Sequence, residues 1–146
     1  MENYLKRLSE KMLGLEFIKI PSIAGAEEDE VLRVYENVAF PFSVERVFTV
    51  TAHRGAIRGL HAHKKCTQIL SCVSGEIDLL VDDGVSQKIL RLTTDSDAVL
   101  LPSGIWAEQR YLKNCSVLIV QCDQPYDEDD YLRDYEEFIE WRNKTK

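Results

Sequence analysis

The sequence predicts an all-β fold of the sandwich or jelly-roll type, with a short helix at each end of the chain. About seven short apolar or alternating runs follow one another at regular spacing, and turn residues separate them. Helical patterns of about 10–15 residues, which would join the strands of a parallel sheet, do not lie between these runs. The pattern therefore favours a sandwich or jelly-roll barrel over a parallel α/β sheet.

Length and composition indicate one domain. The chain has 146 residues, and 45% of them are hydrophobic, which is enough for a single continuous core. The net charge is −7, but residues 123–140 alone carry nine carboxylates against one arginine. The rest of the chain is close to neutral and has no clustered Lys and Arg, so nucleic acid is excluded as a partner.

The first element is a helix at the N-terminus. Apolar residues recur at helical spacing within residues 2–13, and Gly14 follows as a stop signal. We expect residues 1–14 to form a helical extension and residues 15–146 to form a single domain.

The next elements are strands. Each is a short apolar or alternating run bounded by turn residues; they are Glu16–Ile20, Ser43–Thr51, Thr67–Val73, Glu76–Val81, Gln87–Thr93, Ala98–Leu101 and Ser116–Gln121. The turn Asp82-Asp83-Gly84 joins two of these runs as a hairpin, which requires antiparallel pairing.

The last element is a second helix. Aromatic and aliphatic residues recur at helical spacing between Asp127 and Arg142. This spacing would lay one apolar face of the helix on the sheets, and it would leave the many carboxylates of the segment in solvent.

The chain contains no run of about 18 apolar residues, so we predict no membrane partner and a cytoplasmic location. The four cysteines form no Cys-x-x-Cys pair and lie in strand-like segments. We therefore expect reduced thiols rather than disulfides.

Two of the three histidines stand two positions apart, at His61 and His63. On a strand, positions i and i+2 share a face, so both imidazoles would project together and Lys65 would continue the row. Two surface histidines on a strand are the alternative interpretation of the pair taken alone.

The wider spacing resembles the first cupin motif. Its positions are Gly55, His61, His63, Gln68 and Gly75. Residues 102–107 resemble the second motif, whose metal-binding histidine would fall at Ala107. The resemblance implies a cupin jelly-roll β-barrel. Because Gln68 and Ala107 occupy metal positions, too few ligands remain for a transition metal, and we predict no metal and no cofactor.

Within the cupins, three segments resemble the nucleotide-sugar 3,4-ketoisomerases, and the resemblance covers residues 38–140. The segments are Pro41–Phe48, Arg58–Lys65 followed by Gln68, and Tyr126–Tyr135. This family acts on dTDP-4-keto-6-deoxyglucose and moves the ketone from C4 to C3 through an enediol, without a metal. The resemblance implies an enzyme of deoxyaminosugar synthesis for surface polysaccharide, and a homodimer.

By position, His61 matches the family's base, and His63 matches its partner in proton shuttling or in polarising the carbonyl. Imidazole suits this chemistry, because its unperturbed pKa is near neutrality. For the pyrophosphate we expect Arg46 and Arg58, since a guanidinium matches phosphate oxygens in geometry. Lys65, Gln68 and Trp106 complete the expected substrate contacts: Gln68 through a sugar hydroxyl or by orienting His63, and Trp106 by stacking.

Two positions differ from the family. Relatives commonly have Tyr and a polar or cationic residue where this chain has Phe48 and Ala107. The C4 configuration of the product is therefore not predicted. Two alternatives remain open: a nucleotide-sugar 3,5-epimerase, and a catalytically idle cupin that binds a sugar nucleotide.

Overall fold

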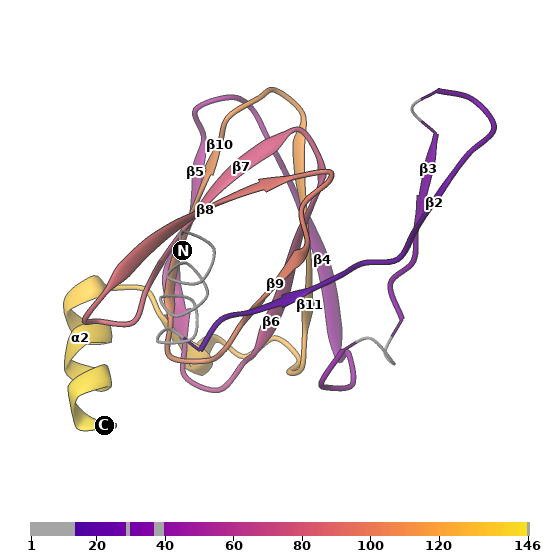
Figure 1. Cartoon of the computed structure of the whole chain (residues 1–146). Coiled ribbons are helices and arrows are strands. Elements are labelled where there is room, and N and C mark those ends of the chain that lie inside the picture. The colour runs from indigo at the N-terminus through magenta and orange to yellow at the C-terminus, as the bar shows by residue number, and fades with distance from the viewer. Residues whose placement is uncertain (1–13, 29, 37–39, 146) are drawn as a thin grey trace, which may run out of the picture.

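A computed structural model describes residues 14–28, 30–36 and 40–145. The predicted N-terminal helix falls on residues 2–13 and lies outside the described part of the chain. The described segments form twelve strands, a single 3-10 turn and one α-helix (Figure 1).

Two five-stranded sheets face each other. The first has the order β1-β9-β6-β11-β4, and the second has the order β12-β5-β10-β7-β8. Their strands are β1 (Glu16–Ile18), β4 (Arg46–Ala52), β5 (Ile57–His63), β6 (Gln68–Ser74), β7 (Glu76–Asp82), β8 (Gln87–Thr93), β9 (Ala98–Leu101), β10 (Trp106–Tyr111), β11 (Ser116–Cys122) and β12 (Tyr131–Leu132). Every pairing within these sheets is antiparallel.

The chain passes repeatedly from one sheet to the other, as in a jelly roll, which confirms the predicted fold class. The two sheets are not joined into a closed barrel, so the fold is a sandwich. Buried apolar side chains from both sheets, among them Leu70, Leu79, Val99 and Leu118, fill the space between them.

All seven predicted strands are present, with some differences at their ends. The β7–β8 hairpin turns at Asp82-Asp83-Gly84, as predicted. Gly84 has a φ of +85°, and its backbone amide donates a hydrogen bond to the side chain of Asp82. The predicted runs do not include β5, although the histidine pair on it was interpreted as lying on a strand, nor β10, β12 or the hairpin of β2 (Ser22–Ala24) and β3 (Val31–Arg33). This hairpin extends away from the two sheets (Figure 1).

The predicted C-terminal helix starts too early. The chain from Glu128 to Asp130 makes one 3-10 turn capped by Asp127, residues 131 and 132 are extended as β12, and α2 is limited to Tyr135–Lys144. Asp134 caps α2 by accepting a hydrogen bond from the Glu137 amide at 3.0 Å. Tyr131 and Leu132 therefore belong to a sheet edge rather than to a helix face.

None of the four cysteines forms a disulfide, as predicted; Cys66, Cys72 and Cys122 are buried, and Cys115 is exposed. Within residues 14–28, 30–36 and 40–145, no helix is long and apolar enough to cross a membrane.

Candidate active site

A β-bulge determines where the two histidines point. On β5, Gly59 has a φ of +81° and Leu60 has a φ of +60°. The register between β5 and β10 shifts at these residues: Gly59 pairs with Glu108, but His61 pairs with Ala107. A Cβ at Gly59 would lie 2.9 Å from the carbonyl oxygen of Ala107, so only glycine fits there. After the bulge, His61 and His63 share one face, and their ring centroids are 5.0 Å apart.

His63 is held by Asp130. The Nδ1 atom of His63 lies 2.8 Å from Oδ2 of Asp130, and both side chains are buried. Asp130 also accepts hydrogen bonds from the backbone amides of Lys65 at 2.6 Å and Cys66 at 3.4 Å. The carboxylate therefore keeps the proton of His63 on Nδ1, while Nε2 is buried without a protein partner. Burial lowers the pKa of His63, against the opposing effect of Asp130.

His61 is held by the backbone of the bulge. Its Nδ1 lies 3.0 Å from the carbonyl oxygen of Gly59, which fixes the neutral tautomer with a lone pair on Nε2. Burial lowers the pKa of His61 to about 4; the bond to Gly59 opposes this shift, and the neighbouring His63 adds to it. His61 is therefore a neutral imidazole at pH 7, which is the form that can accept a proton.

Tyr131 completes the cluster from β12. Its ring centroid lies 4.9 Å from that of His61 and 4.4 Å from that of His63. The guanidinium of Arg133 lies 4.3 Å from the Tyr131 ring, and it donates two hydrogen bonds to the carboxylate of Glu128. These contacts fix the phenol ring beside both imidazoles.

A cavity of about 400 Å³ opens over this cluster, between the two sheets. Its polar lining is His61, Tyr131, Arg133, Arg58, Gln68 and Gln109, and Phe48, Val50 and Val120 provide an apolar wall. His61 lines this cavity, whereas His63 is not among its lining residues and lies behind His61 with its Nε2 buried. A pocket with convergent polar groups and an imidazole of shifted pKa is the arrangement expected of an active site.

The structure brings only some of the expected substrate residues to this cavity. Arg58 and Gln68 line it. Arg46 lies beside it: its guanidinium is 5.5 Å from the ring of the lining residue Phe48 and 5.6 Å from the ring of Tyr126. The Nε atom of Arg46 is buried and has no partner in the protein.

Lys65 and Trp106, the other two residues expected to contact substrate, do not line the cavity. β5 ends at His63, so Lys65 does not continue the row of histidines, and its side chain is exposed. Trp106 is buried on the opposite side of β5 and β10, under α2, where its ring centroid lies 5.7 Å from that of Phe138. Its indole N–H donates to Glu108 at 3.0 Å, so it is a core residue with its polar atom satisfied.

Sequence analysis did not single out Asp130, Tyr131 or Arg133 as site residues. They lie in the segment interpreted as a helix, where their positions would have been unrelated to the histidines. The one available signal was the Tyr-Asp-Glu-x-Asp-Tyr segment, residues 126–131, which was used to identify the family rather than the site.

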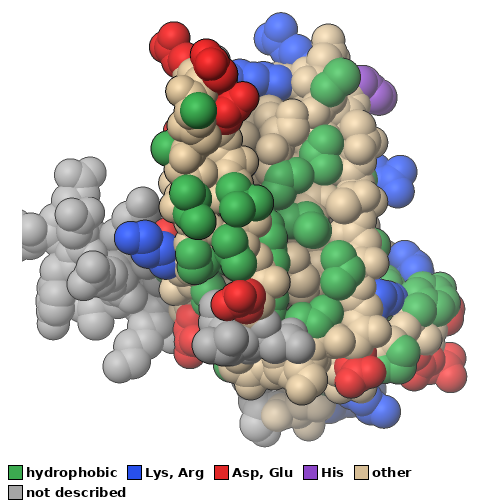
Figure 2. Space-filling view, turned by 90° about the vertical axis from the view of Figure 1, so that its right-hand side faces the viewer, with side chains coloured by type: hydrophobic (Ala, Val, Ile, Leu, Met, Phe, Trp, Pro, Cys, Tyr) green, Lys and Arg blue, Asp and Glu red, His purple; other side chains and the backbone are tan. Residues whose placement is uncertain are grey.

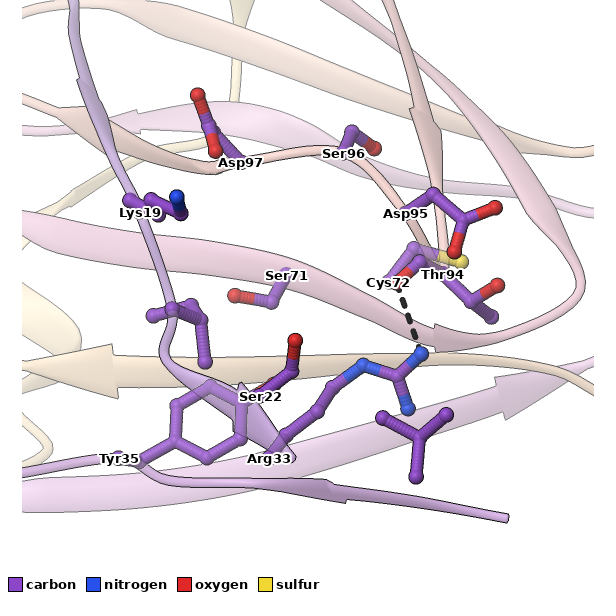
Figure 3. A pocket seen from close by; sticks show the side chains of 12 residues that line it. Lys19, Ser22, Arg33, Tyr35, Ser71, Cys72, Thr94, Asp95, Ser96 and Asp97 are labelled. Carbon is purple, nitrogen blue, oxygen red and sulfur yellow. Dashed lines mark hydrogen bonds between the residues drawn. The ribbon is translucent and has the colours of Figure 1, made fainter. Parts of the chain in front are cut away.

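A second cavity, of about 220 Å³, lies between residues 19–22 and 31–35 on one side and the turn after β8 on the other (Figure 3). Arg33 spans it and donates to the carbonyl oxygen of Thr94 at 2.9 Å, which ties the β2–β3 hairpin to the body of the fold. This cavity contains neither histidine of the β5 cluster, and we do not assign the chemistry to it.

One group of side chains has the residue types of a metal site. Ligand atoms of His63, Cys66 and Asp130 lie within 4.8 Å of one another. Both oxygens of Asp130 already accept hydrogen bonds, from the His63 ring and from two backbone amides. We therefore interpret this group as the support of the His63 ring.

Comparisons with known proteins agree with this geometry. The family model described as WxcM-like, C-terminal (FdtA) matches residues 13–143. A TDP-4-oxo-6-deoxy-alpha-D-glucose-3,4-oxoisomerase of Aneurinibacillus thermoaerophilus is 38% identical over 111 residues, which are 74% of this chain and 78% of that protein.

Similar solved structures include sugar 3,4-ketoisomerases and, at lower identity, an epimerase. QdtA, a sugar 3,4-ketoisomerase from Thermoanaerobacterium thermosaccharolyticum solved with TDP, superposes with a TM-score of 0.82 at 29% identity, covering 90% of this chain and 96% of QdtA. A histidine-to-asparagine variant of QdtA has been solved with TDP-4-keto-6-deoxyglucose. The RmlC epimerase of Mycobacterium tuberculosis, at 17% identity and a TM-score of 0.68, covers 81% of this chain and 67% of that protein; it shares the fold.

Proposed function

This chain belongs to the WxcM-like, C-terminal (FdtA) family, and from that premise we propose that it is a 3,4-ketoisomerase of a TDP-linked 4-keto-6-deoxy sugar, with TDP-4-keto-6-deoxyglucose as the substrate. The relatives named for this activity support the substrate. The observation that carries the proposal is the pair of neighbouring imidazoles, each with Nδ1 bonded to the protein. His61 lines the cavity, and Nε2 of His63 has no partner in the protein.

The tautomers of His61 and His63 indicate which nitrogen accepts each proton of the sugar. His61 Nε2 removes the proton from C3, beside the C4 ketone, and the electrons move to O4, which gives an enediolate. His63 Nε2 takes the proton of the C3 hydroxyl as the C3 ketone forms and passes it to O4. The proton held by His61 exchanges with solvent, and His61 then delivers a solvent-derived proton to C4. No electron leaves the sugar, so the isomerisation needs no redox cofactor.

Charge and shape complete the binding site. Arg58 and Arg46 are the cations for the pyrophosphate, and Gln68 offers an amide to a sugar hydroxyl. The apolar wall that includes Phe48 limits access of water to the enediolate. We further propose a cytoplasmic enzyme of deoxyaminosugar synthesis, whose 3-keto product is consumed by a transaminase.

Proton NMR in deuterated water, with and without EDTA, tests the reaction and the absence of a metal together. With TDP-4-keto-6-deoxyglucose we expect a 3-keto product with deuterium at C4 and no effect of the chelator. Deuterium at both C3 and C5 would instead identify an epimerase. Binding without turnover would identify an idle binding protein, and loss of turnover on chelation would identify a metal enzyme.

The low pKa of His61 predicts a specific pH profile. Because the pKa is lowered to about 4, His61 stays neutral and competent as a base down to about pH 5, where an ordinary histidine is mostly protonated. We expect kcat to hold on acidification through pH 6 and to fall with an apparent pKa far below 6.5, as measured by initial rates in overlapping buffers. A fall of kcat centred near pH 6.5 would contradict the lowered pKa of His61 as the base.

The same shift predicts that acid destabilises the fold. The unfolded chain binds a proton at His61 near its ordinary pKa of about 6.5, while the folded chain binds it only near 4. This contribution to stability is therefore present above about pH 6.5 and is lost as the pH falls toward 4. Thermal melts across this range should show a drop in Tm that is smaller in the His61→Asn variant.

We also propose that the protein is a homodimer. Hydrophobic side chains gather on the face that carries the β2–β3 hairpin (Figure 2). Three of the exposed apolar side chains are Ile23 of β2, Leu32 of β3 and Val47 of β4, and each is at least 55% exposed. Exposed apolar surface of this kind is unfavourable in water, and contact with a second copy of the chain would bury it. Sedimentation should give about twice the chain mass of 16.8 kDa. A 16.8 kDa species alone at micromolar concentration would contradict the dimer.

A further inference from the structure

A buried cysteine lies at the edge of the substrate cavity and takes no part in the proton transfers described above. Cys122 is the last residue of β11, and its side chain is fully buried. In the first sheet it stands directly opposite Arg46 of β4 and Gln68 of β6. Directly opposed residues on neighbouring antiparallel strands point to the same face, so the three side chains meet.

Two hydrogen-bond donors point at the Cys122 sulfur. Arg46 Nη2 and Gln68 Nε2 each lie 3.6 Å from Sγ of Cys122. The thiol of Cys66 is a further neighbour, and its interaction with Cys122 lowers the pKa of Cys122. A thiolate accepts hydrogen bonds from several donors, whereas a neutral thiol at this position would have to place a proton of its own among them.

Charge balance leads to the same conclusion. Arg46 is partly buried, and within the described residues no carboxylate lies at ion-pair distance from it. A partly buried guanidinium without a counter-charge is unfavourable, and the sulfur of Cys122 is the group placed to supply that charge. The other titratable groups around Arg46 are Tyr126, Tyr131, His63 and Cys66, and Asp123 follows Cys122 in the chain.

We propose that Cys122 is a thiolate whose negative charge positions Arg46 and Gln68 for the substrate. Since the amide nitrogen of Gln68 is bonded to the sulfur, its carbonyl oxygen is left to accept a hydrogen bond from a sugar hydroxyl. Arg46 uses Nη2 on the sulfur and also interacts with the Tyr131 hydroxyl, so these two contacts fix the direction in which its guanidinium faces an anionic oxygen. The role of Arg46 and Gln68 in binding a sugar nucleotide rests on the proposed function. The negative charge of Cys122 does not depend on that function.

The hydrogen bonds with Cys66, Arg46 and Gln68 lower the pKa of Cys122 below its ordinary value, against the effect of burial. The pKa of Cys66 is raised by the same coupling, so Cys66 keeps its proton. Only one of the two buried sulfurs is then charged, which avoids two like charges in contact.

The charge can be measured without substrate. In protein labelled at the Cβ of cysteine, we expect one of the four 13C signals to have the thiolate shift at about pH 7, where an ordinary thiol is mostly protonated. That signal should be lost in Cys122→Ser and should move to the thiol position in Arg46→Met. Cys72→Ser, a change at another buried cysteine, should leave it in place. Four thiol signals at neutral pH would overturn the proposal.

A matched pair of variants tests the positioning. Cys122→Asp and Cys122→Asn place side chains of equal size at one site and differ in charge. We expect the Asn variant to raise KM for the sugar nucleotide by about tenfold, and the Asp variant to recover most of this loss. Equal losses in two variants with native circular dichroism would overturn the role of the charge.

These readouts separate the two proposals. A thiolate signal in a protein that binds the sugar nucleotide without isomerising it would contradict the proposed function and leave the thiolate standing. In that case, the dissociation constant of the sugar nucleotide replaces KM in the comparison of the Asp and Asn variants. An active isomerase with four neutral thiols would contradict only the thiolate.

Discussion

Replacement of His61 by Asn should stop isomerisation while the sugar nucleotide still binds. Asn is close to imidazole in size and polarity, but it cannot accept the C3 proton at neutral pH. General-base catalysis typically contributes about 10²- to 10⁴-fold, so we expect kcat to fall by at least about 10²-fold. Product formation followed by NMR, together with calorimetric titration of TDP, measures both effects.

His53 provides the matched control for this experiment. It is exposed in the turn between β4 and β5 and does not line the cavity over the β5 cluster. His53→Asn should therefore leave kcat and the affinity for TDP unchanged. If His61→Asn also kept full turnover, His61 would not be the base, and His63→Asn would become the next variant to test.

Replacement of Asp130 by Ala should cause a large loss of stability and of activity. The change removes the acceptor of three buried or partly buried donors: His63 Nδ1 and the amides of Lys65 and Cys66. A buried donor left without a partner costs about 1–3 kcal/mol, so we expect a loss of at least about 3 kcal/mol in the free energy of unfolding. The tautomer of His63 is no longer fixed, and kcat should fall with it.

Urea denaturation and initial rates measure the two effects of this change. Asp129→Ala is the control, because Asp129 is the neighbouring acidic residue and its side chain is exposed; a surface change of this kind is expected to stay within about 0.5 kcal/mol. If Asp130→Ala were as stable as the control, Asp130 would not be what holds the segment before β12 to the end of β5. If stability fell and kcat did not, the tautomer of His63 would not matter to the reaction.

The strands of the sandwich were predictable from local patterns. Alternating or apolar runs such as Glu76–Val81 and Gln87–Thr93, joined by an Asp-Asp-Gly turn, specify an antiparallel hairpin through side-chain burial and positive φ alone. The jelly-roll class followed from the order of such runs, and the family followed from the segments around His61 and Tyr126. His61 itself was predictable because a strand places positions i and i+2 on one face.

Three parts of the site depended on tertiary structure. Trp106 has the residue type of a stacking platform, but the opposite face of β5 and β10 is covered by α2, and this burial makes it a core residue. Tyr131 has helical spacing to its neighbours, but β-pairing with His63 at the edge of the second sheet outweighs that local preference. Cys122 gains donors from β4 and β6 only after three distant strands align.

The sequence by itself determined the fold class, the family and the two imidazoles on β5, because these depend on residue type and on spacing within a single strand. Only the tertiary structure decided which partner each imidazole has, which cations reach the cavity and which sulfur is surrounded by donors. The physical reason is that tautomers, pKa shifts and charge pairing depend on contacts between residues far apart in the chain, such as His63 with Asp130 and Arg46 with Cys122.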